Sequence, residues 1–140
     1  IGWEVLCLGR RASGERFETG ALRLATHLGR AGRPLWLERG RLEGDASLLD
    51  SPAGLAGFSV SATLLPVAPA LSPELLAACR EARAREAGAR HAVTLLPELL
   101  VARYLGHSSE AARHWCAGLW QRLRPAMAGR EAHPPRIWNT

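Results

Sequence analysis

The sequence contains no lysine and none of the motifs through which common enzymes bind phosphate or activate a nucleophile. It has no Walker-type glycine loop ending in lysine, no Gly-x-Ser-x-Gly elbow, no His-Glu-x-x-His and no Cys-x-x-Cys. No apolar run approaches the roughly 20 residues of a membrane span, and the first residues do not resemble a signal peptide. These absences argue against an enzyme and against a membrane protein, and they favour a cytoplasmic chain.

Cysteine is scarce, and its pattern argues against a disulfide framework. Cys7, Cys79 and Cys116 are odd in number, widely separated and embedded in apolar stretches, which predicts reduced thiols in the core. What the chain does have is material for a core, because 47% of its 140 residues are apolar and five are tryptophan. Such a chain is most simply one domain, residues 1–140, that buries roughly two-thirds of the surface its unfolded form exposes.

The charge is basic, since all 18 positively charged residues are arginine and the net charge is +5. A basic chain suggests a nucleic-acid-binding module. The arginines are nevertheless dispersed among 13 acidic residues, and no aromatic and basic motif of a known RNA or DNA module is present. A solvated surface, or an interface with an acidic protein, is the other interpretation.

Apolar periodicity predicts an α+β fold in which strands dominate. The segments with strand-like patterns are residues 2–9, 22–28, 35–39, 57–65 and 91–105, the last interrupted at Pro97. Residues 2–9 are apolar on both faces apart from Glu4, which is typical of a central strand or of one between two layers. Glycines in residues 29–34 predict an antiparallel hairpin between the second and third segments.

Two helices are expected, at about 73–87 and 109–124. Ser72 suits the N-cap of the first, and Gly88 suits its end. Pro125 has no N–H to donate, so the second helix should end or kink there. The apolar residues at helical spacing in the second helix and just beyond it are Ala112, Trp115, Cys116, Leu119, Trp120, Leu123 and Met127.

Histidine and cysteine gather near the second helix, which raises the question of a metal site. His114 and Cys116 are two residues apart on a helix and therefore diverge, and His107 and His133 lie outside it. Glu110 and His114 are four residues apart and can meet. An ion pair between them is the better interpretation, with a metal-ligand pair as the alternative.

Two carboxylates stand in apolar strand segments. Glu4 shares its strand face with leucines, and Glu38 shares its face with Trp36. Because burying an unpaired charge is costly, each must be paired, protonated, metal-bound or exposed to a wet cavity. Pairing with an arginine such as Arg10 or Arg39 is one possibility, and lining an internal polar passage is the other.

Several short motifs occur in one order from end to end of the chain. They are WEVLCLGR (residues 3–10), GERF (14–17) followed by Gly20, PLWLER (34–39), RYLG (103–106), LRP (123–125) and PRIWNT (135–140). In these motifs the chain resembles the C-terminal half of the urease accessory protein UreD (UreH) family. The start at Ile1, inside a strand, fits a product that lacks the upstream β-rich half.

The resemblance implies a non-enzymatic maturation factor with a β-helix-like stack of strands and two helices. Such a factor binds apo-urease and, with UreF and the GTPase UreG, inserts nickel into the urease active site, with UreE as the usual nickel donor. It implies no tightly bound cofactor, only nickel in transit. Glu4 and Glu38 then line the nickel passage, with Glu4 in place of a more usual aspartate.

The tail, residues 134–140, is a candidate docking segment because it is stiffened by proline and carries a tryptophan that looks exposed. Arg136, Ile137 and Trp138 are its candidate partner-binding residues, and the tail can dock either onto this fold or onto a partner. Two other functions remain open at this point, a basic nucleic-acid-binding module and a non-functional truncated fragment.

Overall fold

The computed structural model describes residues 1–44, 47–68 and 70–139, which form two compact units. Unit 1 combines Ile1–Leu6 with the chain from Val60 onward, and unit 2 is Cys7–Ser59. Antiparallel strands dominate and two α-helices accompany them, so the α+β class is confirmed. The β-helix-like stacking is not confirmed, and the single domain stays a prediction.

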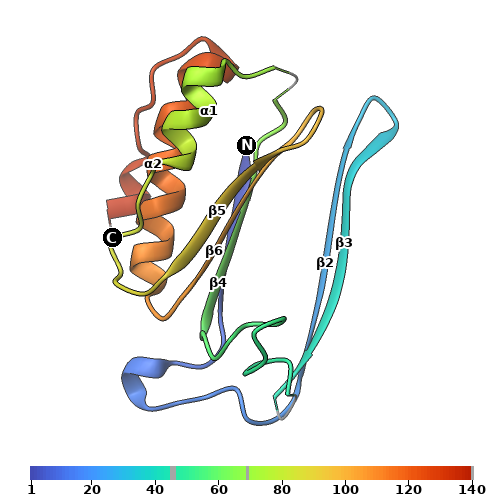
Figure 1. Cartoon of the computed structure of the whole chain (residues 1–140), viewed down its shortest axis with the longest axis vertical. Helices are drawn as coiled ribbons and strands as arrows, with labels where there is room; N and C mark the ends of the chain where they lie inside the picture. The colour runs from blue at the N-terminus through green and yellow to red at the C-terminus, as the bar shows by residue number, and fades with distance from the viewer. Residues whose placement is uncertain (45–46, 69, 140) are drawn as a thin grey trace. The chain divides into compact units, whose positions relative to one another are not determined.

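Unit 1 is built on a four-stranded sheet (Figure 1). Its strands, in spatial order, are β1 (Gly2–Cys7), β4 (Val60–Leu65), β6 (Leu100–Gly106) and β5 (Arg90–Leu95). The break expected at Pro97 separates β5 from β6, which pair antiparallel. Of the two positions expected for residues 2–9, the central one is wrong, because β1 lies at the edge of the described sheet, and the one between two layers stays a prediction. Trp3 and Val5 pack against the core, whereas Glu4 is exposed.

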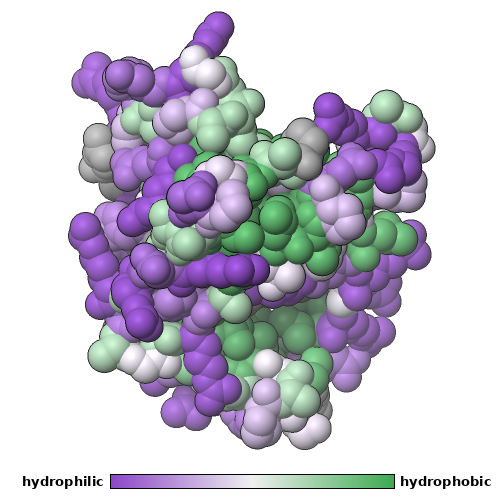
Figure 2. Space-filling view, turned by 45° about the horizontal axis from the view of Figure 1, so that its top comes forward, coloured by the Kyte–Doolittle hydropathy of each residue, from purple (hydrophilic) through white to green (hydrophobic). Residues whose placement is uncertain are grey.

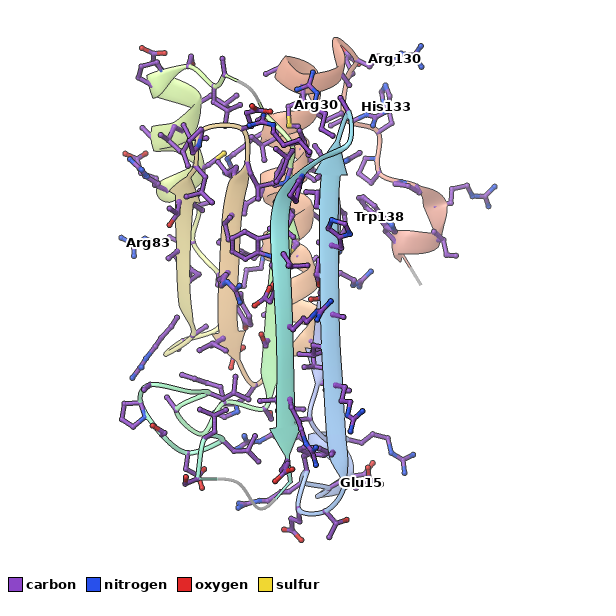
Figure 3. All side chains as sticks on the ribbon, turned by 90° about the vertical axis from the view of Figure 1, so that its right-hand side faces the viewer. Glu15, Arg30, Arg83, Arg130, His133 and Trp138 are labelled. Atoms are coloured by element: carbon purple, nitrogen blue, oxygen red, sulfur yellow. The ribbon has the colours of Figure 1, made fainter. Side chains whose placement is uncertain are left out.

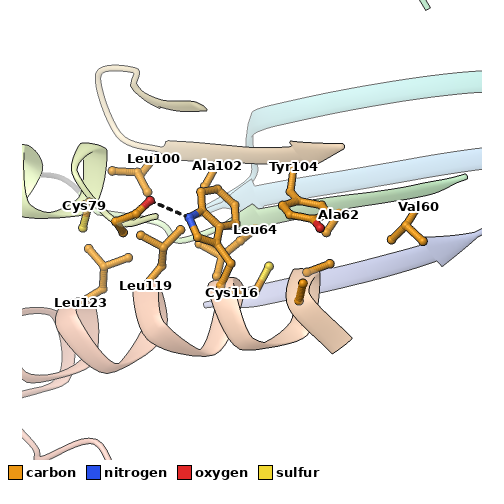
Figure 4. Packing of buried hydrophobic residues seen from close by; sticks show 14 residues of the cluster. Val60, Ala62, Leu64, Cys79, Leu100, Ala102, Tyr104, Cys116, Leu119 and Leu123 are labelled. Atoms are coloured by element: carbon orange, nitrogen blue, oxygen red, sulfur yellow. Dashed lines mark hydrogen bonds between the residues drawn. The ribbon is translucent and has the colours of Figure 1, made fainter. Parts of the chain in front are cut away.

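Helices α1 (Pro73–Arg80) and α2 (Ser109–Ala128) lie on one face of this sheet (Figure 1). The apolar stripe of α2 packs there against β4 and β6 (Figure 4). The fully buried side chains of this interface include Leu64, Leu100, Tyr104, Cys116, Leu119 and Leu123. Because each large apolar side chain taken from water contributes about 1.5–3 kcal/mol, this contact is the principal apolar core of unit 1.

Helix α2 begins where the sequence predicts and ends later. The side chain of Ser108 accepts a hydrogen bond from the Ala111 N–H at 3.1 Å, as an N-cap does. The predicted end at Pro125 is wrong, because the helix continues to Ala128 and the left-handed Gly129 follows it. A proline this close to the C-terminus removes only one helical hydrogen bond, and the Pro125 carbonyl is itself used by the Gly129 N–H.

Helix α1 ends at Arg80, so the predicted helix over about 73–87 is too long. Its start is as expected, since Ser72 accepts from the Leu75 N–H at 3.2 Å. Beyond Arg80, backbone groups are bound by distant side chains instead of by a helix. The Trp115 Nε1–H donates to the Ala82 carbonyl at 2.9 Å, the dashed line in Figure 4. The Ala84 N–H donates to His91 Nε2 at 3.4 Å.

Glu86, in the same segment, lies at the N-terminus of α2. Its carboxylate accepts hydrogen bonds from the backbone N–H groups of His107 (2.7 Å) and Ser108 (3.0 Å), and from the Tyr104 hydroxyl. Partial burial acts to raise the pKa of Glu86, but these bonds outweigh it and lower the pKa below its ordinary value. A Cβ at Gly106 would lie 2.3 Å from the Tyr104 hydroxyl and 2.6 Å from the Glu86 carboxylate. Glycine at this position therefore leaves room for the bond between Tyr104 and Glu86.

The cysteines are free, as predicted, but only two of them belong to the core. Cys79 and Cys116 are buried, and burial raises the pKa of both thiols, that of Cys116 to about 12. Both stay protonated near neutral pH and behave as small apolar side chains. Cys7 is exposed at the end of β1, so its expected core position is wrong.

Unit 2 contains a 3-10 turn (Arg11–Ser13) and the predicted hairpin of β2 (Ala21–Arg30) and β3 (Arg33–Glu43). The two residues between the strands, Ala31 and Gly32, have φ of 50° and 78°. Positive φ at both positions is what a type I′ turn requires, and that turn matches the twist of paired strands. Figure 3 shows the hairpin face-on, with Arg30 close to its tip.

His91 gives unit 1 a predictable dependence on pH. Its ring lies 5.3 Å from the Trp115 ring, and burial, with a smaller contribution from Arg83, lowers its pKa. The folded protein therefore favours neutral His91, whose contribution to stability is complete above the ordinary pKa of about 6.5 and is lost as pH falls below it. We expect the free energy of unfolding, measured with urea, to fall between about pH 7.5 and about pH 5.5.

His91→Gln should flatten this decline, because glutamine does not titrate. His133→Gln is the matched control, since the His133 side chain is 84% exposed and its replacement should leave the decline in place. An unchanged slope in His91→Gln would contradict the assignment.

Candidate functional site

The C-terminal tail docks onto unit 1 through Trp138. Its ring lies between those of Trp3 on β1 and Trp120 on α2, at centroid distances of 4.7 and 4.9 Å. Both pairs have the T-shaped, edge-to-face geometry that aromatic rings prefer. Trp138 joins a strand near one end of the sequence to a helix and a tail near the other.

Two arginines of α2 hold the backbone of the tail. Arg113 donates to the Trp138 carbonyl, and Arg124 Nε donates to the Glu131 carbonyl at 3.2 Å. The Arg124 guanidinium also lies 5.3 Å from the centre of the Trp120 ring, within the range of a cation–π contact. Because residue 131 meets the end of α2 and residue 138 meets its middle, the tail runs back along the helix.

The three candidate residues of the tail therefore differ in how far their side chains are exposed to solvent. Trp138 is half-buried, so the expectation that it looks outward is wrong. Arg136 is exposed, and Ile137 is 74% exposed, the largest fraction among the exposed large hydrophobic residues of the described chain. All three lie in a short 3-10 turn, Arg136–Asn139, that directs neighbouring side chains differently. Thr140, the last residue of the predicted tail, lies outside the described residues.

Glu4 is exposed on β1, on the face opposite the one that carries Trp3 and Val5. By the same alternation, Thr63 of β4 and Arg103 of β6 also lie on the face away from the core, directly opposite each other. Arg10, one of the arginines considered as a partner, forms its ion pair with Glu15 instead. Thr63 is buried and Leu6 shares the face of β1 that carries Glu4, so Glu4 is an exposed carboxylate on a mixed polar and apolar face.

Glu38 lies on the apolar face of the hairpin, directly opposite Thr26. It is half-buried and accepts a hydrogen bond from the Trp36 Nε1–H at 3.2 Å. The side chains that share this face are mostly apolar: Leu22, Leu24, Leu28, Trp36 and Leu42. Glu4 belongs to unit 1 and Glu38 to unit 2. Their role as lining of a nickel passage stays a prediction.

The histidine of α2 behaves as its spacing indicates. His114 Nδ1 lies 3.9 Å from the Glu110 carboxylate, so the predicted pair is confirmed, whereas Cys116 is buried on another side of the helix. Across residues 1–44, 47–68 and 70–139, no group of three or more His, Cys, Asp or Glu residues is placed to hold a metal ion. Neither described helix is long and apolar enough to cross a membrane.

Sequence reasoning missed the residues that position the tail and α2. By periodicity alone, Arg113, Arg124 and Glu86 look like solvated charges on helix surfaces. Their partners are backbone groups 25, 7 and 21 residues away along the chain, a separation that no local pattern reveals. The signal that the sequence offers is Trp120 near Arg124 on the same helix, since tryptophan and arginine are both frequent at protein interfaces.

Comparison with known proteins agrees with the motifs. The family model described as UreD urease accessory protein matches residues 1–139. Proteins named urease accessory protein UreD are 53% identical in Dechloromonas aromatica over 143 residues and 55% identical in Azoarcus sp. over 140 residues. Both alignments cover 100% of this chain but 49% and 48% of the relatives. The chain thus spans about half the length of these relatives and matches their C-terminal half.

The docking of the tail predicts unequal effects at neighbouring positions. Trp138→Ala should lower the free energy of unfolding by about 2 kcal/mol, because it removes a half-buried ring and two aromatic contacts. Ile137→Ala, the matched control one residue away, should change it by less than about 0.5 kcal/mol. Urea unfolding followed by circular dichroism measures both, and equal losses would show that the tail is not anchored by Trp138.

Proposed function

Since the chain belongs to the UreD family of urease accessory proteins, we propose that it acts as a non-enzymatic scaffold in urease maturation. The match of the family model to residues 1–139 carries this proposal. The chain then works in the cytoplasm on apo-urease, together with UreF and the GTPase UreG. Nickel is cargo that passes to urease, with UreE as its upstream donor, and is not a resident cofactor.

The tail supplies a surface for such an assembly. Trp138 fixes the tail to α2, and the same turn presents Arg136 and the apolar Ile137 outward. An exposed aliphatic side chain beside an arginine is a common element of protein interfaces. Because the ring and the carbonyl of Trp138 anchor the turn, little conformational entropy is lost when a partner binds it. We assign this surface to contact with UreF or apo-urease.

Glu4 and Glu38 are the proposed transient contacts for nickel in transit. Carboxylate oxygens bind borderline cations such as Ni²⁺ less tightly than thiolates or imidazoles do, so they favour passage over retention. Glu38, held by the Trp36 indole, has a fixed carboxylate, and Glu4 is open to solvent. Each carboxylate is the type of ligand from which the cation can be released.

The proposal is tested by co-purification. A tagged protein is co-expressed with UreF and apo-urease in two forms. The first form is this chain alone, and in the second form this chain replaces the C-terminal half of the Azoarcus relative. We expect both partners to be retained in at least the second form. The scaffold role would be overturned if the second form retained neither partner although circular dichroism showed that it was folded.

The same preparation tests the nickel contacts. We expect the double variant Glu4→Gln with Glu38→Gln to lower the nickel content of urease several-fold while partners remain bound, because an amide keeps the hydrogen bond to Trp36 but loses the charge. Glu43→Gln, an exposed acid at the end of β3, is the matched control. Nickel content is measured by elemental analysis. Equal nickel content in all three proteins would show that Glu4 and Glu38 have only structural roles.

A further inference from the structure

Three arginines of the hairpin lie on one of its faces. Cross-strand pairing places Arg23 directly opposite Arg41, and Ala25 opposite Arg39, so these side chains share a face. All three arginines are exposed. We call the surface formed by Arg23, Arg39 and Arg41 the arginine face. Like charges directly opposite each other in a sheet are destabilising, so the pairing of Arg23 with Arg41 works against the hairpin on its own.

Within the described part of the hairpin, residues 21–43, acids neutralise this face only in part. Glu43 pairs with Arg41 at 2.6 Å, and both side chains remain about half exposed. Toward the tip, Arg30 and Arg33 are again directly opposite each other. Figure 3 labels Arg30 there, and Figure 2 shows hydrophilic side chains at this tip. The hairpin therefore carries a net positive charge over most of its length.

An apolar side chain stands on the same face. Leu37 is opposite His27, two pairs along from Ala25 and Arg39 and therefore on the same face, and it is 63% exposed. The other leucines of the two strands are half-buried, and Leu22, Leu24, Leu28 and Leu42 lie on the opposite face. Arginine is enriched at protein interfaces, and an exposed apolar side chain beside it gains by burial there.

We propose that the arginine face, with Leu37, binds an acidic segment of a partner protein that carries an apolar side chain for Leu37. Charge complementarity selects the acidic residues, because guanidinium groups form two parallel hydrogen bonds with a carboxylate. The exposed Leu37 favours a protein partner over a nucleic acid, because its burial is favourable when it packs against another apolar group.

A nucleic acid fits this face less well. Proteins that bind single-stranded nucleic acid stack its bases on aromatic side chains. Trp36, the cross-strand partner of Leu28, lies on the other face of the hairpin and cannot serve this purpose here. In a duplex complex the arginines would meet phosphates, but Leu37 would face a charged backbone without an apolar partner. The two classes are separated by the choice of probe.

The test uses the whole chain and two fluorescent probes. One is a synthetic peptide of alternating glutamate and leucine, and the other is a single-stranded DNA oligonucleotide of similar charge. We expect the peptide to bind more tightly than the DNA at moderate salt. The triple variant Arg23→Gln, Arg39→Gln and Arg41→Gln should weaken peptide binding about tenfold, as the loss of three exposed charge pairs implies.

Two controls separate the face from the net charge. Arg83→Gln, Arg85→Gln and Arg130→Gln remove the same charge from exposed positions outside the hairpin and should leave peptide binding within about twofold. Leu37→Ser should weaken binding of the peptide but not of the DNA. Equal losses in both triple variants, tighter binding of the DNA, or no binding of the peptide would each overturn the proposal. The outcome is independent of the urease role, because co-purification measures that role separately.

Discussion

Packing of the apolar stripe of α2 against the four-stranded sheet is the constraint on which the rest of unit 1 depends. Leu119, Leu123 and Cys116 are completely buried there, and Trp115 extends from the same stripe to bind the Ala82 carbonyl. Once α2 is fixed, the N–H groups of His107 and Ser108 just before it are in place for Glu86, and Trp120 is in place for the tail. Hydrogen bonds and ring contacts thus add specificity to an arrangement that apolar burial has already made favourable.

The parts of the fold that follow from local patterns could be predicted from the sequence. The hairpin, the start of α2 and its buried positions depend on periodicity, turn glycines and a serine cap, all of which lie close together along the chain. The end of α1 could not be predicted in this way. Its propensity for helix continues past Arg80, but Ala82 and Ala84 are bound by Trp115 and His91, and such tertiary contacts override propensity.

The same distinction applies to the candidate sites. The motifs identified the family, which the comparisons confirm, and they pointed to Trp138 as a residue of consequence. They did not indicate that its ring faces inward, because the two rings it contacts are 135 and 18 residues away in the sequence. This arrangement suits the proposed scaffold role, since a fixed turn can present Ile137 and Arg136 without first becoming ordered. The hairpin shows the complementary case, in which residues on its outward face contribute little to packing and are available for a partner.

Native-state hydrogen exchange tests the central role of α2 most directly. If the α2 stripe and the sheet form one cooperative core, the amides of Ala112–Leu123 and of β6 should exchange only through the same opening, with the highest free energy in unit 1. Measured at increasing, sub-denaturing concentrations of denaturant, their free energies of exchange should converge together. Exchange of the α2 amides through a lower-energy opening, while β6 stays protected, would contradict this account.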